Sequence, residues 1–314
     1  MNNSFPDLNL EKNRTFKEYL DLSQKALRVM PEWFTPMLDD HNRNVFYRQM
    51  IDGKVKDKIV VDLGSGTGMW SIEALSQGAN FIYIVERNPL LVQYLKVIFK
   101  DKPVKIISGD IDQLKASDFD SGKPEVMIHE LFGVAGLGEG VIPIFEKIWK
   151  IFDPNSLVLI PQHTWLEGRV FYKDPLPMSP QESTLLEDNV ELLYEILYPF
   201  EFKNKQRDGH QLPAASPYPL IYVDLKKIAE GQEHFLETMP VDFKPGKVHS
   251  IHISFRFSAD IEGPFFDTYL EKNHHWSDAE IEFYVKKTLK PETKKFSIYL
   301  HENSNFVNPE FLEN

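Results

Sequence analysis

A short apolar run that leads into a glycine-rich loop restricts most strongly what this chain can fold into. Residues 58–63 (Lys-Ile-Val-Val-Asp-Leu) are rich in β-branched side chains, and Gly64, Gly66 and Gly68 follow at alternate positions. A run of this kind, bounded by glycine, is typical of a buried strand in a parallel sheet. Apolar residues at helical spacing from 69 to 77 then complete a strand, a loop and a helix in direct succession.

Strands and helices keep alternating as far as residue 161. The pattern predicts strands at 81–85, 104–107, 126–128 and 157–160 and helices at 39–51, 89–99 and 141–152. From about Trp165 the apolar residues recur with period two, which predicts antiparallel strands. We therefore expect an α/β fold in which a doubly wound parallel-sheet domain is followed by an antiparallel β-barrel domain.

Two further helices are predicted, one before the alternating strands and helices and one after them. Apolar residues at helical spacing between 16 and 30 predict an N-terminal helix, and leucines at 180–199 predict a helical arm within the second half. Such an arm either docks on a second subunit or packs as an insert within the same chain.

The composition limits the classes of partner. Lys and Arg number 35 against 47 Asp and Glu, so the formal net charge of -12 argues against binding to a phosphate backbone. The chain has no cysteine, which excludes disulfides, thiolate metal sites and cysteine nucleophiles. No apolar run reaches the ~18 residues of a membrane span, and the first residues lack a signal-peptide pattern. We expect a soluble cytoplasmic protein without nucleic-acid or membrane partners.

The glycine loop predicts a nucleotide-like cofactor, with S-adenosylmethionine favoured. A strand that runs into glycines before a helix brings bare backbone N–H groups close to a ligand. Glu86 ends the next strand, where a doubly wound fold places a carboxylate on ribose hydroxyls, roughly 20 residues further along. A dinucleotide is less favoured, because the spacing is G-x-G-x-G and not G-x-G-x-x-G, and a purely structural turn is the other alternative.

Two glutamates predict a site for a cation. Glu130 follows the strand at 126–128, and Glu139 lies nine positions later, within a stretch whose glycines allow the backbone to fold back. Two converging carboxylates suit a guanidinium, which presents its N–H donors in a planar fork. They would also stabilise the positive charge that arrives when a sulfonium methyl is transferred to nitrogen. The alternative is a pair of surface acids in a loop.

Several motifs carry a resemblance to a known family. The segment from Glu130-Leu131-Phe132 to Gly138-Glu139-Gly140 resembles the double-glutamate loop of the protein arginine methyltransferases, most closely that of the type III, monomethylating branch. Residues 37–47, 61–68 and 78–86 are similar to segments of the same family, and His274-His275-Trp276 resembles its Thr-His-Trp loop. Four motifs in the family's order cover most of residues 33–165.

The resemblance implies roles for individual residues. Arg43 would hold the methionyl carboxylate of S-adenosylmethionine and Glu86 its ribose, with S-adenosylhomocysteine as the product. Asp62, Gly64 and Gly66 would line the cofactor loop. Glu130 and Glu139 would hold the guanidinium, beside a wall made by His275, counted with the catalytic residues, and Trp276, counted with the substrate-binding residues. The alternative for Arg43 is an ordinary arginine on a helix surface.

Differences from the family leave parts of the function open. Type III enzymes carry two modules, whereas this chain has the length of one, so we expect a homodimer, formed through the arm at 180–199. Gly133 replaces an acid and His274 replaces threonine, which leaves mono- against dimethylation open. Related single-module enzymes methylate free arginine, so the acceptor is either free or protein-bound.

These patterns and the resemblance together predict three segments and one activity. Residues 1–52 form helices that cap the cofactor site, residues 53–161 form the S-adenosylmethionine-binding domain, and residues 162–314 form the β-barrel substrate domain. The predicted activity is N-methylation of the guanidino group of arginine, giving omega-N-monomethylarginine. The alternatives are an N-methyltransferase of another small-molecule amine and a catalytically silent methyltransferase fold that binds partners. No metal site is expected, because the histidines at 249 and 252 alternate with apolar residues on a strand.

Overall fold

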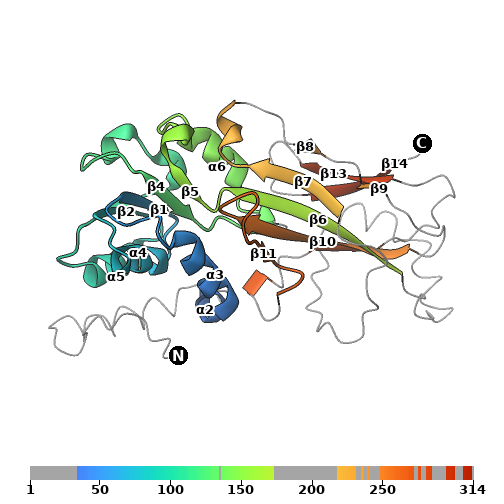
Figure 1. Ribbon diagram of the computed structural model, residues 1–314, viewed down its shortest axis with the longest axis horizontal. Helices are drawn as coiled ribbons and strands as arrows, with labels where there is room; N and C mark the ends of the chain where they lie inside the picture. Colours follow the sequence, from blue (N-terminus) through green and yellow to red (C-terminus); the bar gives the residue numbers. More distant parts are fainter. Residues whose placement is uncertain are drawn as a thin grey trace.

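The structure is a computed structural model that describes residues 34–133, 136–172, 218–230, 235–236, 239–240, 248–271, 275–276, 281–284, 295–300 and 307–312. Figure 1 shows a parallel sheet with its helices on one side of the molecule and long antiparallel strands on the other. The helices predicted at 16–30 and 180–199 lie outside the described residues.

A five-stranded parallel sheet with the order β3-β2-β1-β4-β5 forms the first half. Its strands are β1 (Ile59–Leu63), β2 (Phe81–Glu86), β3 (Val104–Ser108), β4 (Val126–His129) and β5 (Val158–Ile160). The strand order reverses between β1 and β4, so this is a doubly wound sheet with its switch point at the carboxyl ends of those two strands. The predicted fold of this half is confirmed.

Helices cover both faces of the parallel sheet (Figure 1). They are α2 (Phe34–Asp39), α3 (His41–Ile51), α4 (Met69–Ser76), α5 (Pro89–Ile98) and α6 (Val141–Ile148). Residues of α3, α4 and α5 pack in one apolar core and residues of α6 in another. Local sequence sets where these helices begin: the Asn88 side chain accepts hydrogen bonds from the backbone N–H groups of Leu90 and Leu91, and Pro89 occupies the first position of α5.

Antiparallel strands form the second half. They are β6 (His163–Tyr172), β7 (Tyr218–Asp224), β8 (Phe235–Leu236), β9 (Met239–Pro240), β10 (Val248–Ser258), β11 (Phe266–Asp267), β12 (Ile281–Tyr284), β13 (Lys295–Leu300) and β14 (Val307–Leu312). One sheet has the order β11-β10-β6-β7-β8, with β12 also paired to β10, and a second has the order β14-β13-β9. The predicted antiparallel arrangement is confirmed, and closure of these sheets into a barrel stays a prediction.

The two halves share their apolar cores. Phe132, just after β4, packs with Phe255 and Phe257 of β10 in the same core as Val60 and Ile82 of the parallel sheet. The other core joins further residues of the parallel sheet to residues of β6 and β7. The loop that carries the predicted glutamates is therefore fixed between both halves.

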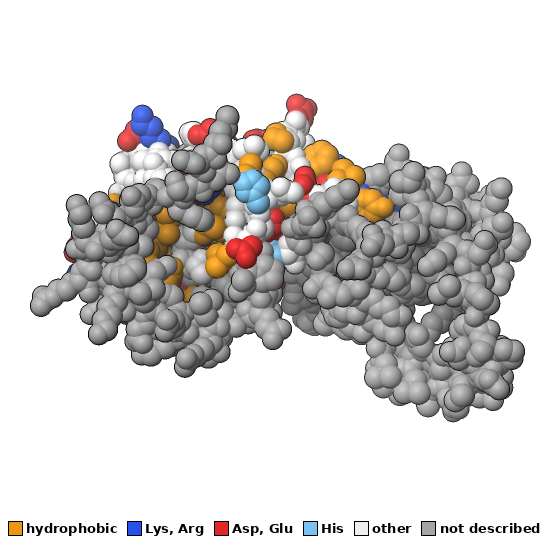
Figure 2. All heavy atoms as spheres, turned by 90° about the horizontal axis from the view of Figure 1, so that it is seen from below, with side chains coloured by type: hydrophobic (Ala, Val, Ile, Leu, Met, Phe, Trp, Pro, Cys, Tyr) orange, Lys and Arg blue, Asp and Glu red, His pale blue; other side chains and the backbone are white. Residues whose placement is uncertain are grey.

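The described surface fits the acidic composition. On the face shown in Figure 2, Lys and Arg side chains of the described residues appear only in small spots, while acidic and histidine side chains lie among hydrophobic ones near the middle. None of the helices in the described part of the chain has the length and apolarity that crossing a membrane requires.

Candidate functional site

A cavity of ≈ 570 Å³ lies at the carboxyl ends of β1, β2 and β4. This is the switch point of the sheet, where doubly wound folds bind their ligands. The charged residues that line the cavity are Arg43, Glu86, Arg87, Asp110, Glu130 and Glu139. Four carboxylates against two arginines leave a surplus of negative charge when all are ionised, which favours a cationic ligand.

The glycine loop forms one wall of the cavity. Gly64 and Gly66 line it with φ angles of 68° and 57°, in the left-handed region that side chains disfavour. The backbone N–H of Gly66 donates a hydrogen bond of 2.8 Å to Glu86, and the N–H of Asn88 donates one of 2.7 Å to the other oxygen of the same carboxylate. Burial raises the pKa of Glu86 although these hydrogen bonds act against it. The loop and Glu86 are thus held together at the edge of the cavity, as the sequence predicts.

Asp62 ends β1 close to this loop but has a different partner. Its side chain is buried and accepts a hydrogen bond of 2.6 Å from the Ser71 hydroxyl on α4. Burial raises the pKa of Asp62 to about 7. Asp62 is not among the residues that line the cavity, so its carboxylate joins α4 to β1 from behind the loop.

Polar atoms around the cavity fit a nucleoside-like cofactor. Arg43 Nε, Ser65 Oγ and Glu130 Oε1 are buried and have no hydrogen-bond partner among the described residues. Buried polar atoms are normally paired, so unpaired ones that border a cavity favour a polar ligand there. Together with the bare glycine backbone and Glu86, they suit the ribose and the charged tail of such a cofactor.

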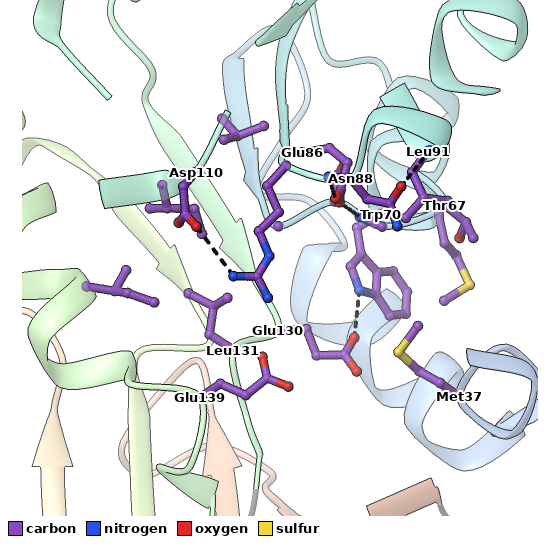
Figure 3. A pocket seen from close by; sticks show the side chains of 18 of the residues that line it. Met37, Thr67, Trp70, Glu86, Asn88, Leu91, Asp110, Glu130, Leu131 and Glu139 are labelled. Carbon is purple, nitrogen blue, oxygen red and sulfur yellow. Dashed lines mark hydrogen bonds and ion pairs between the residues drawn. The ribbon is translucent and has the colours of Figure 1, made fainter. Parts of the chain in front are cut away.

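Glu130 is the most heavily contacted carboxylate of the site. It forms an ion pair with Arg43 Nη2. Its Oε2 also accepts a hydrogen bond of 3.0 Å from Trp70 Nε1, which Figure 3 shows as a dashed line. Its other oxygen, Oε1, lies 3.7 Å from His275 Nε2. Oε2 is thus hydrogen-bonded by the protein, whereas Oε1 accepts no hydrogen bond from the described residues.

Arg43 is held as firmly as the carboxylate that it binds. Its Nη1 donates hydrogen bonds to the carbonyl of Met37 and to the side chain of Asn44, and its guanidinium lies 5.0 Å from the ring centroid of Trp70. Arg43 is buried, so it is not a surface arginine on a helix. It lines the cavity, where the sequence places it, but the carboxylate that it holds is Glu130.

Glu139 lies near Glu130 on the cavity wall and has no ion-pair partner in the part of the chain that the structure describes (Figure 3). Burial and the negative charge of Glu130 raise the pKa of Glu139, and the positive charge of Arg87 acts in the opposite direction. Gly133 lies against it: a Cβ added at Gly133 would be 2.8 Å from Glu139 Cγ and 3.1 Å from its backbone nitrogen. Glu139 can therefore lie in this position only because residue 133 has no side chain.

His275 is joined to Asp40 as well as to Glu130. Its Nδ1 lies 2.9 Å from Asp40 Oδ2, and its backbone N–H donates a hydrogen bond of 3.0 Å to the same oxygen. Burial acts to raise the pKa of Asp40, but hydrogen bonds from His275 and the backbone N–H of Arg43 outweigh it, and the pKa lies below its usual value. Asp40 thus fixes His275 with Nε2 directed at Glu130.

Trp276 packs into the apolar core. It is 3% exposed, its Nε1 donates a hydrogen bond of 3.0 Å to the carbonyl of Phe132, and its ring lies edge-on to Phe255 and Phe257. It does not line the cavity. The observed contacts make Trp276 a support for the loop after β4, and its predicted part in substrate binding stays a prediction.

The structure brings most of the predicted site residues together. Arg43, Gly64, Gly66, Glu86, Glu130 and Glu139 line one cavity, and His275 reaches Glu130 from the second half. Sequence reasoning missed Trp70, Arg87 and Asp110 as parts of this site. A signal existed for Asp110, which lies two residues beyond the end of β3, whereas the contact between Trp70 and Glu130 depends on tertiary packing.

Comparisons with known proteins find a matching family model, similar sequences and similar structures. A protein-family model described as Conserved hypothetical protein 95 matches residues 22–120. Protein arginine N-methyltransferase 7 of Rattus norvegicus is 32% identical over an alignment of 159 residues that covers 46% of this chain and 22% of the rat protein. The chain therefore spans only a small part of the length of that relative.

A second relative aligns over more of the chain, and a solved structure shares its fold. Arginine N(omega)-methyltransferase of Streptomyces achromogenes subsp. streptozoticus is 23% identical over an alignment of 240 residues that covers 74% of this chain and 66% of the relative. The crystal structure of PRMT6-SAH superposes with a TM-score of 0.64 at 16% identity, covering 89% of this chain and 99% of that chain. At this identity the superposition establishes a common fold.

Proposed function

We propose that this chain is an S-adenosylmethionine-dependent N-methyltransferase that acts on the guanidino group of arginine. The observation that carries the proposal is the position of Glu130 and Glu139 on the wall of the same cavity as the glycine loop and Glu86 (Figure 3). The names of the rat and Streptomyces relatives support the same reaction.

The cofactor site is assigned to one part of the cavity. Glu86 would accept hydrogen bonds from ribose hydroxyls, and the backbone of Gly64 and Gly66 would allow the nucleoside to approach closely. Arg43 would hold the carboxylate of the cofactor's amino-acid part through its Nε, which has no hydrogen-bond partner among the described residues and would make a charge-assisted bond there. When bound, S-adenosylmethionine supplies an electrophilic methyl group on a sulfonium.

The two glutamates orient the acceptor. The unpaired oxygen of Glu130 and the carboxylate of Glu139 would accept N–H groups of the substrate guanidinium and draw its positive charge away from the attacking nitrogen. They would hold the attacking nitrogen in line with the methyl group, and the proton that the methylated nitrogen loses would pass to water or to one of these carboxylates. The contribution of the protein is mainly alignment and charge stabilisation.

Arg43 and His275 position Glu130 for this task. Arg43 and Trp70 hold one carboxylate oxygen, and His275, itself fixed by Asp40, lies beside the other. A carboxylate held on one side presents the other in a fixed direction, which is the preorganisation that a transition state requires.

The finer points of function belong to the proposal as well. The resemblance to the monomethylating branch favours omega-N-monomethylarginine as the product, from free or protein-bound arginine. We further propose a cytoplasmic homodimer that pairs through residues 180–199. Light scattering coupled to gel filtration tests the dimer, and a mass of one chain would refute it.

Incubation with labelled S-adenosylmethionine tests the activity. The protein would be given free L-arginine, an arginine-rich peptide and, as controls for another amine acceptor, free L-lysine and a lysine-rich peptide. We expect label in one of the two arginine acceptors, with a mass gain of one methyl group. Label only in a lysine acceptor would favour methylation of another amine, and no label together with binding of S-adenosylhomocysteine would favour the catalytically silent alternative.

A further inference from the structure

Tyr47, on α3, lies behind the wall of the cavity and has no part in the roles assigned above. It is fully buried and is not among the residues that line the cavity. Its hydroxyl donates a hydrogen bond of 3.0 Å to the carbonyl of His129, the residue before Glu130. Burial and the negative charge of Glu130 raise the pKa of Tyr47 well above its usual value, so the hydroxyl keeps the proton that it donates.

The ring of Tyr47 also supports the indole that binds Glu130. The rings of Tyr47 and Trp70 are stacked, with their centroids 4.5 Å apart and their planes 14° from parallel. Trp70 Nε1 donates the hydrogen bond of 3.0 Å to Glu130 Oε2 that is drawn as a dashed line in Figure 3. An indole N–H points within the plane of its ring, so a stacked neighbour that fixes this plane also restricts the direction of the donor.

Tyr47 is therefore connected to Glu130 by two routes. One passes through the carbonyl of His129 and fixes the backbone next to Glu130. The other passes through Trp70 and fixes Oε2 of the side chain. A carboxylate that is held at its backbone and at one oxygen presents its other oxygen in a fixed direction. That oxygen is Oε1, which is buried and has no hydrogen-bond partner among the described residues.

We propose that Tyr47 is a positioning residue that directs Oε1 of Glu130 toward the acceptor guanidinium, acting through the backbone of His129 and the indole of Trp70. The inference rests on the proposed function, because that function makes Glu130 a ligand of the acceptor. Tyr47 does not line the cavity, so its effect reaches the acceptor only through the residues that it holds.

Tyr47→Phe and Trp70→Phe test the two routes, because each removes one donor and keeps an aromatic ring. We expect Tyr47→Phe to lower kcat/KM for the arginine acceptor about three- to tenfold, and Trp70→Phe about ten- to hundredfold, since a hydrogen bond to a charged group is the stronger one. Calorimetric titration of the acceptor into protein saturated with S-adenosylhomocysteine should show affinities in the same order. Affinity for S-adenosylhomocysteine itself should change less than about twofold.

Tyr83→Phe and Trp149→Phe are the matched controls. Tyr83 is fully buried, and its hydroxyl donates a hydrogen bond of 3.0 Å to the carbonyl of Gly122. Trp149 Nε1 donates one of 2.7 Å to the carbonyl of Leu225. Neither Tyr83 nor Trp149 lines the cavity. Both controls should lose stability in urea, as the two site variants do, but should keep the kcat/KM of the wild type.

A double variant separates positioning of Glu130 from a general loss of structure. In a Glu130→Gln background, Tyr47→Phe should lower kcat/KM by less than about twofold further, because the carboxylate that Tyr47 positions is already absent. A loss in Tyr47→Phe no larger than that in Tyr83→Phe, or an undiminished loss in the Glu130→Gln background, would overturn the role of Tyr47. A wild type that methylates neither free L-arginine nor an arginine-rich peptide would instead overturn the proposed function, and this inference with it.

Discussion

Arg43 and Glu130, 87 residues apart in the chain, form an ion pair beside the cavity, with side chains only 2% and 9% exposed. The guanidinium of Arg43 binds the carboxylate that is proposed to bind the guanidinium of the substrate. Because Arg43 binds one oxygen of Glu130, an acceptor guanidinium would bind the other oxygen of Glu130 and the carboxylate of Glu139. Two arginine side chains would then share Glu130: Arg43 binds it permanently, and the substrate arginine would bind it during turnover.

Removing Arg43 should weaken both the fold and cofactor binding. Arg43→Met leaves Glu130 buried without its cation, for which we expect a loss of about 3–5 kcal/mol in the free energy of unfolding. Affinity for S-adenosylhomocysteine, measured by calorimetry, should fall as well. Arg48→Met is a suitable control: Arg48 pairs with Glu73 with 32% of its side chain exposed and should lose no more than about 1 kcal/mol. Equal losses in the two variants would contradict the weight given to the buried pair.

The two glutamates should respond alike in activity and differently in stability. Glu130→Gln and Glu139→Gln are each expected to lower turnover by about 10²–10³-fold, because each removes charge stabilisation from the acceptor site. In urea unfolding, Glu130→Gln should lose stability, since Arg43 loses its anion. Glu139→Gln should be as stable as the wild type or more so at pH 8, because it replaces a buried carboxylate without an ion-pair partner among the described residues. Unchanged turnover in either variant would refute the role of that glutamate.

A side chain at position 133 should disturb the acceptor and spare the cofactor. The Cβ of Gly133→Ala would lie 2.8 Å from Glu139 Cγ, so Glu139 must shift. Overpacking of about 1–3 kcal/mol corresponds to roughly 5- to 160-fold in kcat/KM for the acceptor. Affinity for S-adenosylhomocysteine, whose proposed contacts lie elsewhere, should change less than about twofold. A loss of cofactor affinity as large as the loss of kcat/KM would show that the loop moved as a whole.

Two buried groups on neighbouring strands should have opposite effects on stability as pH changes. The pKa of Asp62 is raised by burial to about 7, so its contribution to stability falls as pH rises from about 4 to 7. The pKa of His129 is lowered by burial to about 4, so its contribution is complete above about 6.5 and is lost as pH falls toward 4. Each amounts to on the order of 3–4 kcal/mol, and between pH 4 and 6.5 the two oppose each other.

Unfolding of single variants should reveal each contribution. Relative to the wild type, Asp62→Asn should gain stability as pH rises through this window, and His129→Gln should gain as pH falls through it. Both substitutions can keep the existing hydrogen bonds, to Ser71 and to the carbonyl of Pro161. The double variant should differ from the wild type by an amount that hardly depends on pH between 4 and 6.5. Parallel curves for all four proteins would rule out these protonation states.

The parallel sheet was predictable because its strands are apolar on both faces. Each strand therefore appears in the sequence as a short run of adjacent apolar residues. The placement of Glu86 and Glu130 at one edge followed, since the carboxyl ends of parallel strands meet there. Glu139 could be assigned to the same place only through the glycines that allow the chain to fold back. The prediction of these residues thus depended on local pattern.

Contacts between distant residues could not be predicted in the same way. The link between Asp40 and His275 joins positions 235 residues apart, and nothing in the residues next to either side chain specifies it. The burial of Trp276 likewise depends on strands whose pairing is long-range, and its predicted part in the wall of the substrate site stays a prediction. The pairing of β6 with β10 is of the same kind, because period-two patterns identify strands without identifying their partners.

Phe132, two residues after Glu130, stacks on Phe257 at 4.8 Å, and its carbonyl accepts the hydrogen bond from Trp276. The loop after β4 is therefore supported by β10 and by residues 275–276 of the second half. The residues that line the cavity belong to the first half. A chimaera that joins residues 34–161 of this chain to the second half of a relative would need matching aromatic rings at the seam. Without them, an intact set of carboxylates would sit on a loop that has lost its aromatic support.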